Sequence, residues 1–498
     1  MSADSSLIPS SLFTDADVIS RPLCVDLDGT LVTTDTLGES VVLLLRRLPW
    51  LCFLLPLWLL GGRAAFKAAV ADRVSLDPAA LPYRHDLLKA LRFSRDKGRK
   101  LVLATAADLR IAQSVADHLG IFDAVHGSQG ARNLKASEKG DLLCATYGKG
   151  GFDYVGDSTA DAPIFALAAQ GYLVGATRGA IAAANGLASV KVLSRRPSLL
   201  RAIVKELRLH QWSKNALVVV PLVLAPGAPN TPMLVRAMLA FLSFSCCASA
   251  GYVLNDLLDM GADRAHPTKR NRPFASGALP VLMGVPLLVA LLGASFGLAG
   301  AFSSPSFVVM LGLYFAGTLS YSLFFKRKLM LDVLMLAGLY THRILSGGVA
   351  TGVHVSAWLL GFSMFIFTSL AFAKRFIELR GMTTDDTIEN RGYSRTDLEM
   401  VTSMGTASGY IAALVFMLYV ESAAVRASYR EPTLLWLVLP ILLYWLGRIW
   451  LLAGRGKMQD DPVKFALKDS HSLLCALFVG LIAALARFAP QQLSDALH

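Results

Sequence analysis

Long apolar segments fill the second half of this chain, and they constrain its fold more than any other feature. From about residue 205 onward, nine segments each approach the ~20 residues that a helix needs to cross a bilayer. They lie near residues 213–229, 233–255, 279–301, 306–325, 329–350, 356–373, 403–421, 433–453 and 471–489. Charged residues make up 17% of the chain, below the roughly 25% of soluble domains. The sequence therefore predicts an integral membrane protein whose second half is an all-α bundle of nine transmembrane helices.

The loops between these segments alternate between basic and nearly uncharged. The basic set consists of Arg208, Lys214, Arg264, Lys269, Arg270, Arg272, Lys326, Arg327, Lys328, Lys374, Arg375, Arg380, Arg391, Arg395, Arg455, Lys457, Lys464 and Lys468. The other set carries only Arg426 and Arg430, which lie in one loop. By the positive-inside rule, the basic loops face the cytoplasm. Membrane topology thereby accounts for the net charge of +12, and we expect no nucleic acid as a partner.

The N-terminal stretch, MSADSSLIPSSLFTDADV, has neither the basic region nor the apolar core of a signal peptide, which predicts a cytoplasmic start. We expect a multi-pass protein of the bacterial cytoplasmic (inner) membrane, with its N-terminal domain and active sites in the cytoplasm and its C-terminus outside. The predicted organisation is a domain at 1–195, a basic linker at 196–212 and a membrane domain at 213–498.

Residues 1–195 have the pattern of an α/β domain in which polar residues end short apolar strands. The strand predicted in PLCVDLDGTLV is followed by Asp26, and the strand in KLVLATAAD is predicted to end in Thr105. A third, in FDYVGDSTADAPIF, ends in Asp157, with Asp161 four residues later, and Lys139 precedes it in NLKASEKGDLL. The first motif alone could be an ordinary turn. The whole set predicts a ligand site, because open α/β sheets bind ligands at the carboxyl ends of their strands.

These motifs, in this order, resemble the haloacid dehalogenase (HAD) superfamily over about residues 20–190. The second aspartate, Asp28, favours its phosphatases, because dehalogenase members lack it. The resemblance implies a Rossmann-like domain with a helical cap and a carboxylate nucleophile that takes up the phosphoryl group. Its implied catalytic residues are the nucleophile Asp26, the general acid and base Asp28, and the phosphoryl ligands Thr105 and Lys139. Its implied Mg²⁺ ligands are Asp26, Asp28, Asp157 and Asp161. Lys135 is an alternative to Lys139.

A strongly apolar stretch, LPWLCFLLPLWLLGG, interrupts the α/β domain at residues 48–62. It is short for a membrane span, and a single crossing here would place Asp26 and Thr105 on opposite sides of the membrane. We therefore expect a cap over about residues 38–90 that lies at the membrane interface. The alternative is a buried helix of a soluble cap. The interfacial interpretation predicts a lipid or lipid-linked phosphate as the substrate of this domain.

The stretch NDLLDMGADRAHPTKRNRP, which begins at Asn255, places acids and bases between two apolar segments. Asn255, Asp259 and Asp263 are spaced by four residues, and Asp256 precedes Asp259 by three, so a helix would carry all of them on one face. Such a row of acids predicts a Mg²⁺ site for a diphosphate. The basic residues that can hold the outer phosphate oxygens are Lys269, Arg270 and Arg272. The alternative is a solvated charged loop.

The pattern NDxxDxxxD followed by RP resembles the UbiA superfamily of membrane prenyltransferases, and YSLFFKRKLMLD aligns loosely with its second acidic motif. Three further stretches narrow the resemblance to the decaprenyl-phosphate phosphoribosyltransferase branch: LRLHQWSKN from Leu207, AFAKRFIEL from Ala371 and DDPVKFALKD from Asp460. The implied ligands of Mg²⁺ are Asp256, Asp259 and Asp263. The implied substrate-binding residues are Asn255, Lys269, Arg270, Arg272, Lys214, Tyr321, Lys326, Asp332, Lys374 and Arg375. His266, beside a proline, is interpreted as structural.

The two resemblances together predict a bifunctional enzyme that uses Mg²⁺ in both domains. Its membrane domain would transfer 5-phosphoribosyl from phosphoribosyl diphosphate (PRPP) to decaprenyl or undecaprenyl phosphate and release diphosphate. Its N-terminal domain would dephosphorylate the 5-phosphoribosyl-phosphoryl-polyprenol, toward lipid donors of D-arabinose or ribose for arabinan precursors. One alternative is an aromatic prenyltransferase of the quinone-precursor type with an unrelated fused HAD phosphatase. The other is a degenerate HAD fold that acts as a scaffold. Oligomers are compatible with the sequence.

Overall fold

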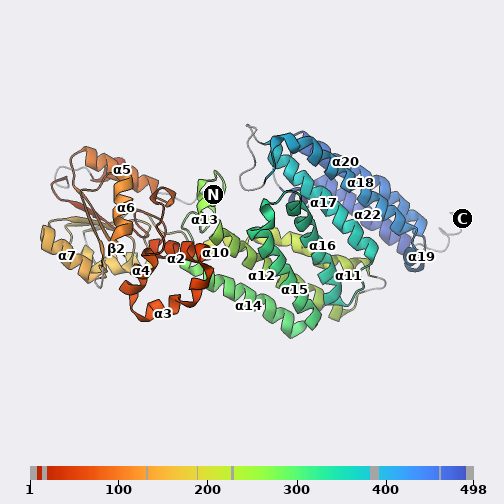
Figure 1. Ribbon diagram of the computed structural model, residues 1–498, viewed down its shortest axis with the longest axis horizontal. Coiled ribbons are helices and arrows are strands. Elements are labelled where there is room, and N and C mark those ends of the chain that lie inside the picture. The colour runs from red at the N-terminus through yellow and green to blue at the C-terminus, as the bar shows by residue number, and fades with distance from the viewer. Residues whose placement is uncertain are drawn as a thin grey trace. The chain divides into compact units, whose positions relative to one another are not determined.

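The computed structural model describes residues 8–13, 19–129, 133–187, 189–225, 229–381, 392–458 and 461–488. Arg391 and Asp460, which the sequence analysis names, lie outside these ranges. The chain divides into two compact units (Figure 1). The first unit combines Met1–Leu207 with Tyr252–Leu287, and the second combines Arg208–Gly251 with Leu288–His498. The domain boundaries at 195 and 213 stay a prediction.

A parallel six-stranded sheet forms the centre of the first unit, in the order β3-β2-β1-β4-β5-β6. Its strands are β1 (Leu23–Val25), β2 (Leu101–Asp108), β3 (Ala124–Ser128), β4 (Asp153–Gly156), β5 (Gln170–Leu173) and β6 (Val190–Val192). This confirms the α/β class predicted for the N-terminal half. The predicted end of the second strand at Thr105 is wrong: a register shift between Ala104 and Asp108 lets β2 continue pairing with β3 as far as Ser128.

Two apolar layers cover the sheet because side chains alternate along each strand. Leu23 and Val25 of β1 point into a core with α5 (His85–Asp96) and α6 (Leu109–Leu119). Cys24 points into the opposite core, which is closed by α7 (Ser137–Tyr147), α8 (Ala162–Phe165) and α9 (Arg178–Ala184). The first unit is therefore a three-layer α/β sandwich, and its strand ends share one edge.

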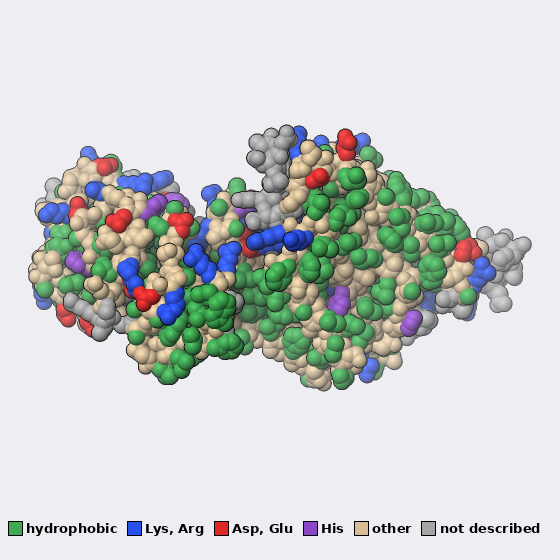
Figure 2. Space-filling view, in the orientation of Figure 1, with side chains coloured by type: hydrophobic (Ala, Val, Ile, Leu, Met, Phe, Trp, Pro, Cys, Tyr) green, Lys and Arg blue, Asp and Glu red, His purple; other side chains and the backbone are tan. Residues whose placement is uncertain are grey.

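A helical insertion between β1 and α5 forms the cap. It consists of α2 (Thr36–Arg47), η2 (Pro49–Phe53), α3 (Leu55–Leu60) and α4 (Arg63–Ala71), followed by η3 (Pro78–Ala80). Prolines at the starts of η2 and α3 divide the apolar stretch into short helices, and none of the residues of α3 is buried. Phe53 and Leu60 are 80% and 85% exposed. Figure 2 shows the resulting apolar patch over α3. The alternative of a buried cap helix does not describe α3.

The remainder of the first unit comes from the segment with the acidic motif. It comprises the end of α12 (Thr231–Leu258), α13 (Met260–Ala265), η6 (Lys269–Asn271), η7 (Val281–Met283) and the start of α14 (Gly284–Phe302). Helix α10 (Leu199–Leu207) contacts this segment, because Lys205 Nζ donates to the carbonyl of Asn271 at 2.7 Å.

Apolar helices make up the second unit. Its elements include η5 (Leu209–Val219), α11 (Val220–Leu224), α15 (Pro305–Leu323), η8 (Phe325–Arg327), α16 (Leu331–Thr351), α17 (Ala357–Arg380), α18 (Leu398–Val420), α19 (Ala423–Ser428), α20 (Val438–Gly454), α21 (Pro462–Ala466) and α22 (Ser470–Phe488). Within the described residues, eight helical stretches of the chain are long and apolar enough to cross a membrane. Their outward side chains give the broad apolar surface in Figure 2. The chain thus contains a helical membrane domain, as predicted.

The ninth predicted span, near 213–229, corresponds to shorter helices. The structure has η5 and α11 there, which end at Leu224, and residues 226–228 lie outside the described part. Polar contacts hold η5: Trp212 donates to the hydroxyl of Ser249 at 3.0 Å, and Asn215 donates to that of Ser245 at 3.2 Å. The count of nine helices therefore stays a prediction.

Candidate functional site

Three buried carboxylates meet at the carboxyl edge of the sheet. Asp26 follows β1 and Asp157 follows β4, and these strands are parallel neighbours with Val25 opposite Val155. Asp161, at the end of η4 (Thr159–Asp161), joins them, and one oxygen from each carboxylate lies within 4.8 Å of the others. In the described part of the chain this is the one such group of metal-binding side chains. Its hard oxygen atoms fit a cation such as Mg²⁺.

A glycine allows this approach of two strands. Gly29 has φ +76°, and a Cβ at this position would lie only 2.2 Å from Oδ2 of Asp157. Both the backbone angle and the missing side chain are therefore required for the turn of the DLDGT motif to pass beside Asp157.

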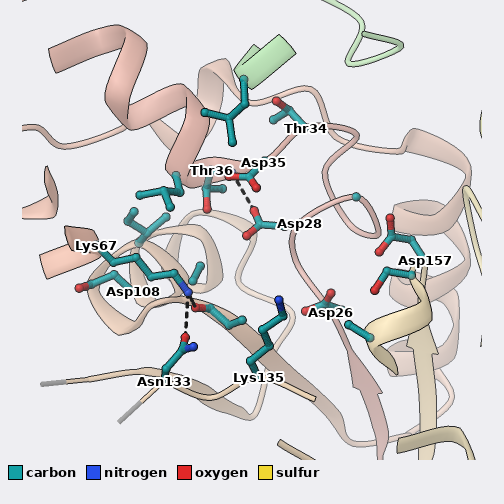
Figure 3. Close-up of a pocket in the computed structure, with 18 of the residues that line it drawn as sticks. Asp26, Asp28, Thr34, Asp35, Thr36, Lys67, Asp108, Asn133, Lys135 and Asp157 are labelled. Atoms are coloured by element: carbon teal, nitrogen blue, oxygen red, sulfur yellow. Dashed lines mark hydrogen bonds between the residues drawn. The ribbon is translucent and has the colours of Figure 1, made fainter. Parts of the chain in front are cut away.

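A buried lysine lies beside the carboxylates. Lys139 of α7 places Nζ 2.9 Å from Oδ1 of Asp26 and donates to the hydroxyl of Tyr154 at 2.7 Å. Tyr154 in turn donates to Oδ1 of Asp161 at 2.9 Å. Of the two candidate lysines, Lys139 makes the ion pair with Asp26, and Lys135 lies in the wall of the adjoining cavity. Figure 3 shows Lys135, Asp26 and Asp157 around this space.

The electrostatics of the cluster favour a bound cation. Burial, aided by Asp161, raises the pKa of Asp26 to about 6, although Lys139 acts in the opposite direction. Burial and the neighbouring carboxylates Asp26 and Asp161 raise the pKa of Asp157 to about 8. Burial alone would lower the pKa of Lys139, but Asp26 and Asp161 outweigh it and raise the value. Full ionisation of the three carboxylates is therefore unfavourable beside a single lysine, and a bound cation would offset this cost.

Asp28 and Thr105 occupy different surroundings. Oδ1 of Asp28 accepts a hydrogen bond from the amide of Thr36 at 2.8 Å (Figure 3). Burial and the nearby carboxylate of Asp35 raise the pKa of Asp28 well above its ordinary value. Thr105 is fully buried inside β2, and its hydroxyl accepts from the amide of Ala107 at 3.0 Å.

A cavity of about 580 Å³ opens above the carboxylates, and we call it the α/β pocket. The cap contributes Phe66, Val70 and Lys67 to its wall, and Lys67 Nζ donates to the carbonyl of Ala106 at 2.6 Å and to Oδ1 of Asn133 at 3.0 Å (Figure 3). Lys67, Asn133 and Tyr154 were not predicted as site residues from the sequence. The one available signal was a single lysine inside the small, apolar α4.

The acidic motif of the first unit is organised by an arginine. Arg272 Nη1 lies 3.1 Å from Oδ1 of Asp256 and 2.6 Å from Oδ2 of Asp263. Both aspartates are buried, whereas Asn255 and Asp259 are partly exposed. Lys269 and Arg270 lie in η6 on the exposed surface. The predicted spacing therefore brings Asp256 and Asp263 to one basic side chain.

Two polar clusters lie within the second unit. In the first, Nε of Arg375 is 2.6 Å from Oδ2 of Asp332, and Tyr393 donates to Oδ1 of the same aspartate at 2.9 Å. Arg375 also pairs with Glu378. Tyr321 lies near the end of α15, and Lys326 lies in η8. Asp332, Arg375, Tyr321 and Lys326 were predicted as site residues from the sequence, whereas Tyr393 and Glu378 were not.

The second cluster joins three distant segments of sequence. Lys214 in η5 forms an ion pair with Oδ2 of Asp461, and Lys374 Nζ of α17 lies 3.8 Å from the same oxygen. Arg343 lies close by, over the ring of Tyr340, which also faces Lys214. Nε of Arg343 donates to Oδ1 of Asn215 at 3.0 Å. Arg343 and Asp461 were not predicted as site residues, and a lone arginine in an apolar helix was the signal for the first.

Comparison with known proteins defines the class of the helical half. The sequence profile described as the UbiA prenyltransferase family matches residues 216–484, more than half of the chain. The chain belongs to the UbiA prenyltransferase family. It is accordingly a multi-pass membrane protein and an enzyme of the UbiA prenyltransferase type, which confirms this part of the prediction.

Individual relatives extend this finding. The uncharacterized protein y4nM of Sinorhizobium fredii is 38% identical over 94% of this chain and 91% of its own length. The decaprenyl-phosphate phosphoribosyltransferase of Mycobacterium tuberculosis is 31% identical over 58% of this chain and 95% of that protein. A solved UbiA homolog from Archaeoglobus fulgidus, bound to DMAPP and Mg²⁺, is 14% identical, with a TM-score of 0.45 over 57% of this chain and 99% of that one. The similarity to y4nM thus spans both halves of the chain.

Proposed function

We propose that the membrane domain transfers 5-phosphoribosyl from PRPP to a polyprenyl phosphate. The observation that carries the proposal is the meeting of Lys214, Lys374 and Asp461. These residues come from the three stretches that distinguish the phosphoribosyltransferase branch in the sequence analysis. The similarity to decaprenyl-phosphate phosphoribosyltransferases supports the same reaction. PRPP carries a diphosphate and a separate 5-phosphate, so it needs more cationic ligands than a prenyl diphosphate does.

The transfer is a substitution at the anomeric carbon. An oxygen of the polyprenyl phosphate forms the new bond to this carbon while the bond to the diphosphate oxygen breaks, and positive charge develops on the ribose. The acceptor is already anionic, so no general base is required. Asp256, Asp259 and Asp263 would hold Mg²⁺, and the bound ion would supply positive charge for the diphosphate leaving group. Arg272, which contacts Asp256 and Asp263, would take up the outer diphosphate oxygens.

We further propose that the α/β half is a HAD-type phosphatase that removes the 5-phosphate from this lipid product. Asp26 attacks phosphorus, the bond to the 5-oxygen breaks, and Asp28 gives its proton to that oxygen. Water then attacks the phosphoryl group on Asp26, Asp28 takes up the proton, and phosphate leaves. Lys139 and Thr105 hold the phosphoryl oxygens. Mg²⁺ on Asp26, Asp157 and Asp161 would neutralise the transferring group.

The exposed cap supports a lipid-linked substrate. The apolar side chains of η2 and α3, together with Arg46 and Arg47 at the end of α2, have the composition of an interfacial membrane segment. Placed at the cytoplasmic face of a bacterial membrane, this segment would hold the mouth of the α/β pocket near lipid headgroups. The same face is required for the transferase, because PRPP is a soluble cytosolic metabolite.

A lipid-product assay tests both activities. Purified protein in detergent would receive labelled PRPP, polyprenyl phosphate and Mg²⁺, and the lipids with and without the 5-phosphate would be separated. The wild type should form ribosyl-phosphoryl lipid without the 5-phosphate, and Asp26→Asn should accumulate the phosphorylated form at unchanged total yield. An unchanged ratio of the two lipids in Asp26→Asn would exclude the phosphatase proposal. Turnover only with a prenyl diphosphate would instead support an aromatic prenyltransferase.

A further inference from the structure

We propose that a segment of the UbiA family region completes the α/β pocket and determines which phosphate esters it accepts. We call residues 264–282 the junction segment. The interface that we infer is the packing of the junction segment against α2. Arg264 and Glu39 are the residues that position the segment there. The inference deepens the proposed phosphatase and rests on it for the activity test, but its cross-linking test is independent of any activity.

The junction segment supplies part of the pocket wall. Pro280 and Leu282 line the cavity together with Asp26, Asp28 and the cap residue Phe66. In Figure 3 the green ribbon of this part of the chain passes above Thr34 and Asp35. The floor of the pocket is thus acidic, whereas this wall is apolar. A phosphate ester whose leaving group carries an apolar portion fits such a pocket, and about 580 Å³ is within the usual range for small-molecule sites.

A buried ion pair fixes the segment to the α/β half. Arg264 of α13 contacts both carboxylate oxygens of Glu39 in α2, one of them at 3.0 Å. The two side chains are only 11% and 6% exposed. Arg264 Nε also donates to the carbonyl of Ala275 at 3.0 Å, which closes the segment on itself. A bidentate pair of this kind specifies geometry as well as supplying energy.

Close backbone contact accompanies the ion pair. The hydroxyl of Thr33, five residues after Asp28, donates to the carbonyl of Ser276 at 2.9 Å. Gly277 has φ +72°, and a Cβ there would lie 2.4 Å from Oγ1 of Thr33. A Cβ on Gly38 would lie 3.7 Å from Cβ of Val281. The segment therefore packs directly on the loop that follows the proposed nucleophile.

Cross-linking tests the packing. The distance of 3.7 Å between Cβ positions suits a disulfide, so the full-length double variant Gly38→Cys/Val281→Cys should form one on oxidation. Mass spectrometry of the digested protein would identify the linked peptides despite the native cysteines. Gly186→Cys/Val281→Cys is the control, because a Cβ at Gly186 meets nothing within 4 Å. Absence of the 38–281 disulfide, or equal linkage in the control, would overturn the inferred interface.

Two substrates test the effect on specificity. Arg264→Gln and Glu39→Gln would be given p-nitrophenyl phosphate, and separately the 5-phosphorylated lipid extracted from reactions of Asp26→Asn. We expect the small ester to be hydrolysed as by wild type, and kcat/KM for the lipid to fall about ten- to a hundredfold, since a displaced wall mispositions only the larger substrate. The control is Asp72→Asn, whose pair with Arg110 is exposed. Wild-type lipid hydrolysis by Arg264→Gln would refute the role of this pair. If the double cysteine variant forms the 38–281 disulfide but the wild type dephosphorylates no lipid, the interface is retained and the proposed substrate is rejected.

Discussion

Replacing Gly29 by alanine should lower phosphate release by the α/β half about a hundredfold while the transferase reaction continues. The added Cβ would lie 2.2 Å from Oδ2 of Asp157, whereas ordinary contacts begin at 3.4 Å. Asp157 must therefore move by about an ångström, out of the group that it forms with Asp26 and Asp161. A misplacement of ~1 Å in a catalytic site costs about a hundredfold in rate.

The same substitution also strains the backbone, and a matched variant separates this effect. Gly29 has φ +76°, and Gly150 has φ +71° but nothing within 4 Å of an added Cβ. Alanine in the left-handed region costs roughly 1–2 kcal/mol at either position. Backbone strain should thus destabilise Gly29→Ala and Gly150→Ala to a similar degree, and only Gly29→Ala should lose phosphate release.

The assay would follow phosphate release from p-nitrophenyl phosphate, total labelled lipid from PRPP, and thermal unfolding of each variant. Phosphate release by Gly29→Ala should fall about a hundredfold below that of Gly150→Ala, with equal total lipid. If the two variants release phosphate at rates within a few-fold of each other, Asp157 is not held in place by the absence of a side chain at residue 29, and the metal-site geometry is wrong.

Two further predictions concern buried polar contacts. Asp461→Asn leaves Lys214 and Lys374 without their shared carboxylate, so transferase kcat/KM for PRPP should fall by about ten- to a hundredfold, because a 1 Å displacement of positioned groups has that effect. The control is Glu421→Gln, which removes one charge of an exposed pair with Arg426 and should change kcat/KM little. Equal kcat/KM values for the two variants would contradict the proposed site. Tyr154→Phe removes the hydroxyl between Lys139 and Asp161, which should lower the free energy of unfolding by about 1–3 kcal/mol and the unfolding midpoint by several degrees. Tyr147→Phe should leave the unfolding midpoint unchanged. If calorimetry finds equal midpoints for the two variants, this hydroxyl has no structural role.

The two aspartates that follow β1 and β4, and the eight long apolar helices among the described residues, could be predicted from sequence. Asp26 and Asp157 follow short apolar strands, and the carboxyl ends of parallel strands lie on one edge, so their proximity follows from the pattern. The long apolar helices of the second half follow equally well from length and composition. Local sequence is sufficient in these cases because burial alone selects the element.

Features that depend on contacts between distant segments were not predictable. The continuation of β2 past Thr105 depends on a register shift against β3, and the short helices near 213–229 depend on polar contacts of Trp212 and Asn215 with α12. Tyr154 has the sequence signature of a core residue, and only the fold places its hydroxyl between Lys139 and Asp161. The pairing of Glu39 with Arg264, 225 residues apart, has no local signal at all.

The discontinuity of the first unit has a consequence for how the protein unfolds. The chain enters this unit twice, once as Met1–Leu207 and again as Tyr252–Leu287, and helices α12 and α14 each begin or end inside it. A cut in the chain between the two passages would therefore leave the fragments associated through the Glu39–Arg264 pair and its surroundings. Melting of the α/β sandwich should also release the ends of α12 and α14, so heat or denaturant would disorder the acidic motif in the same cooperative transition.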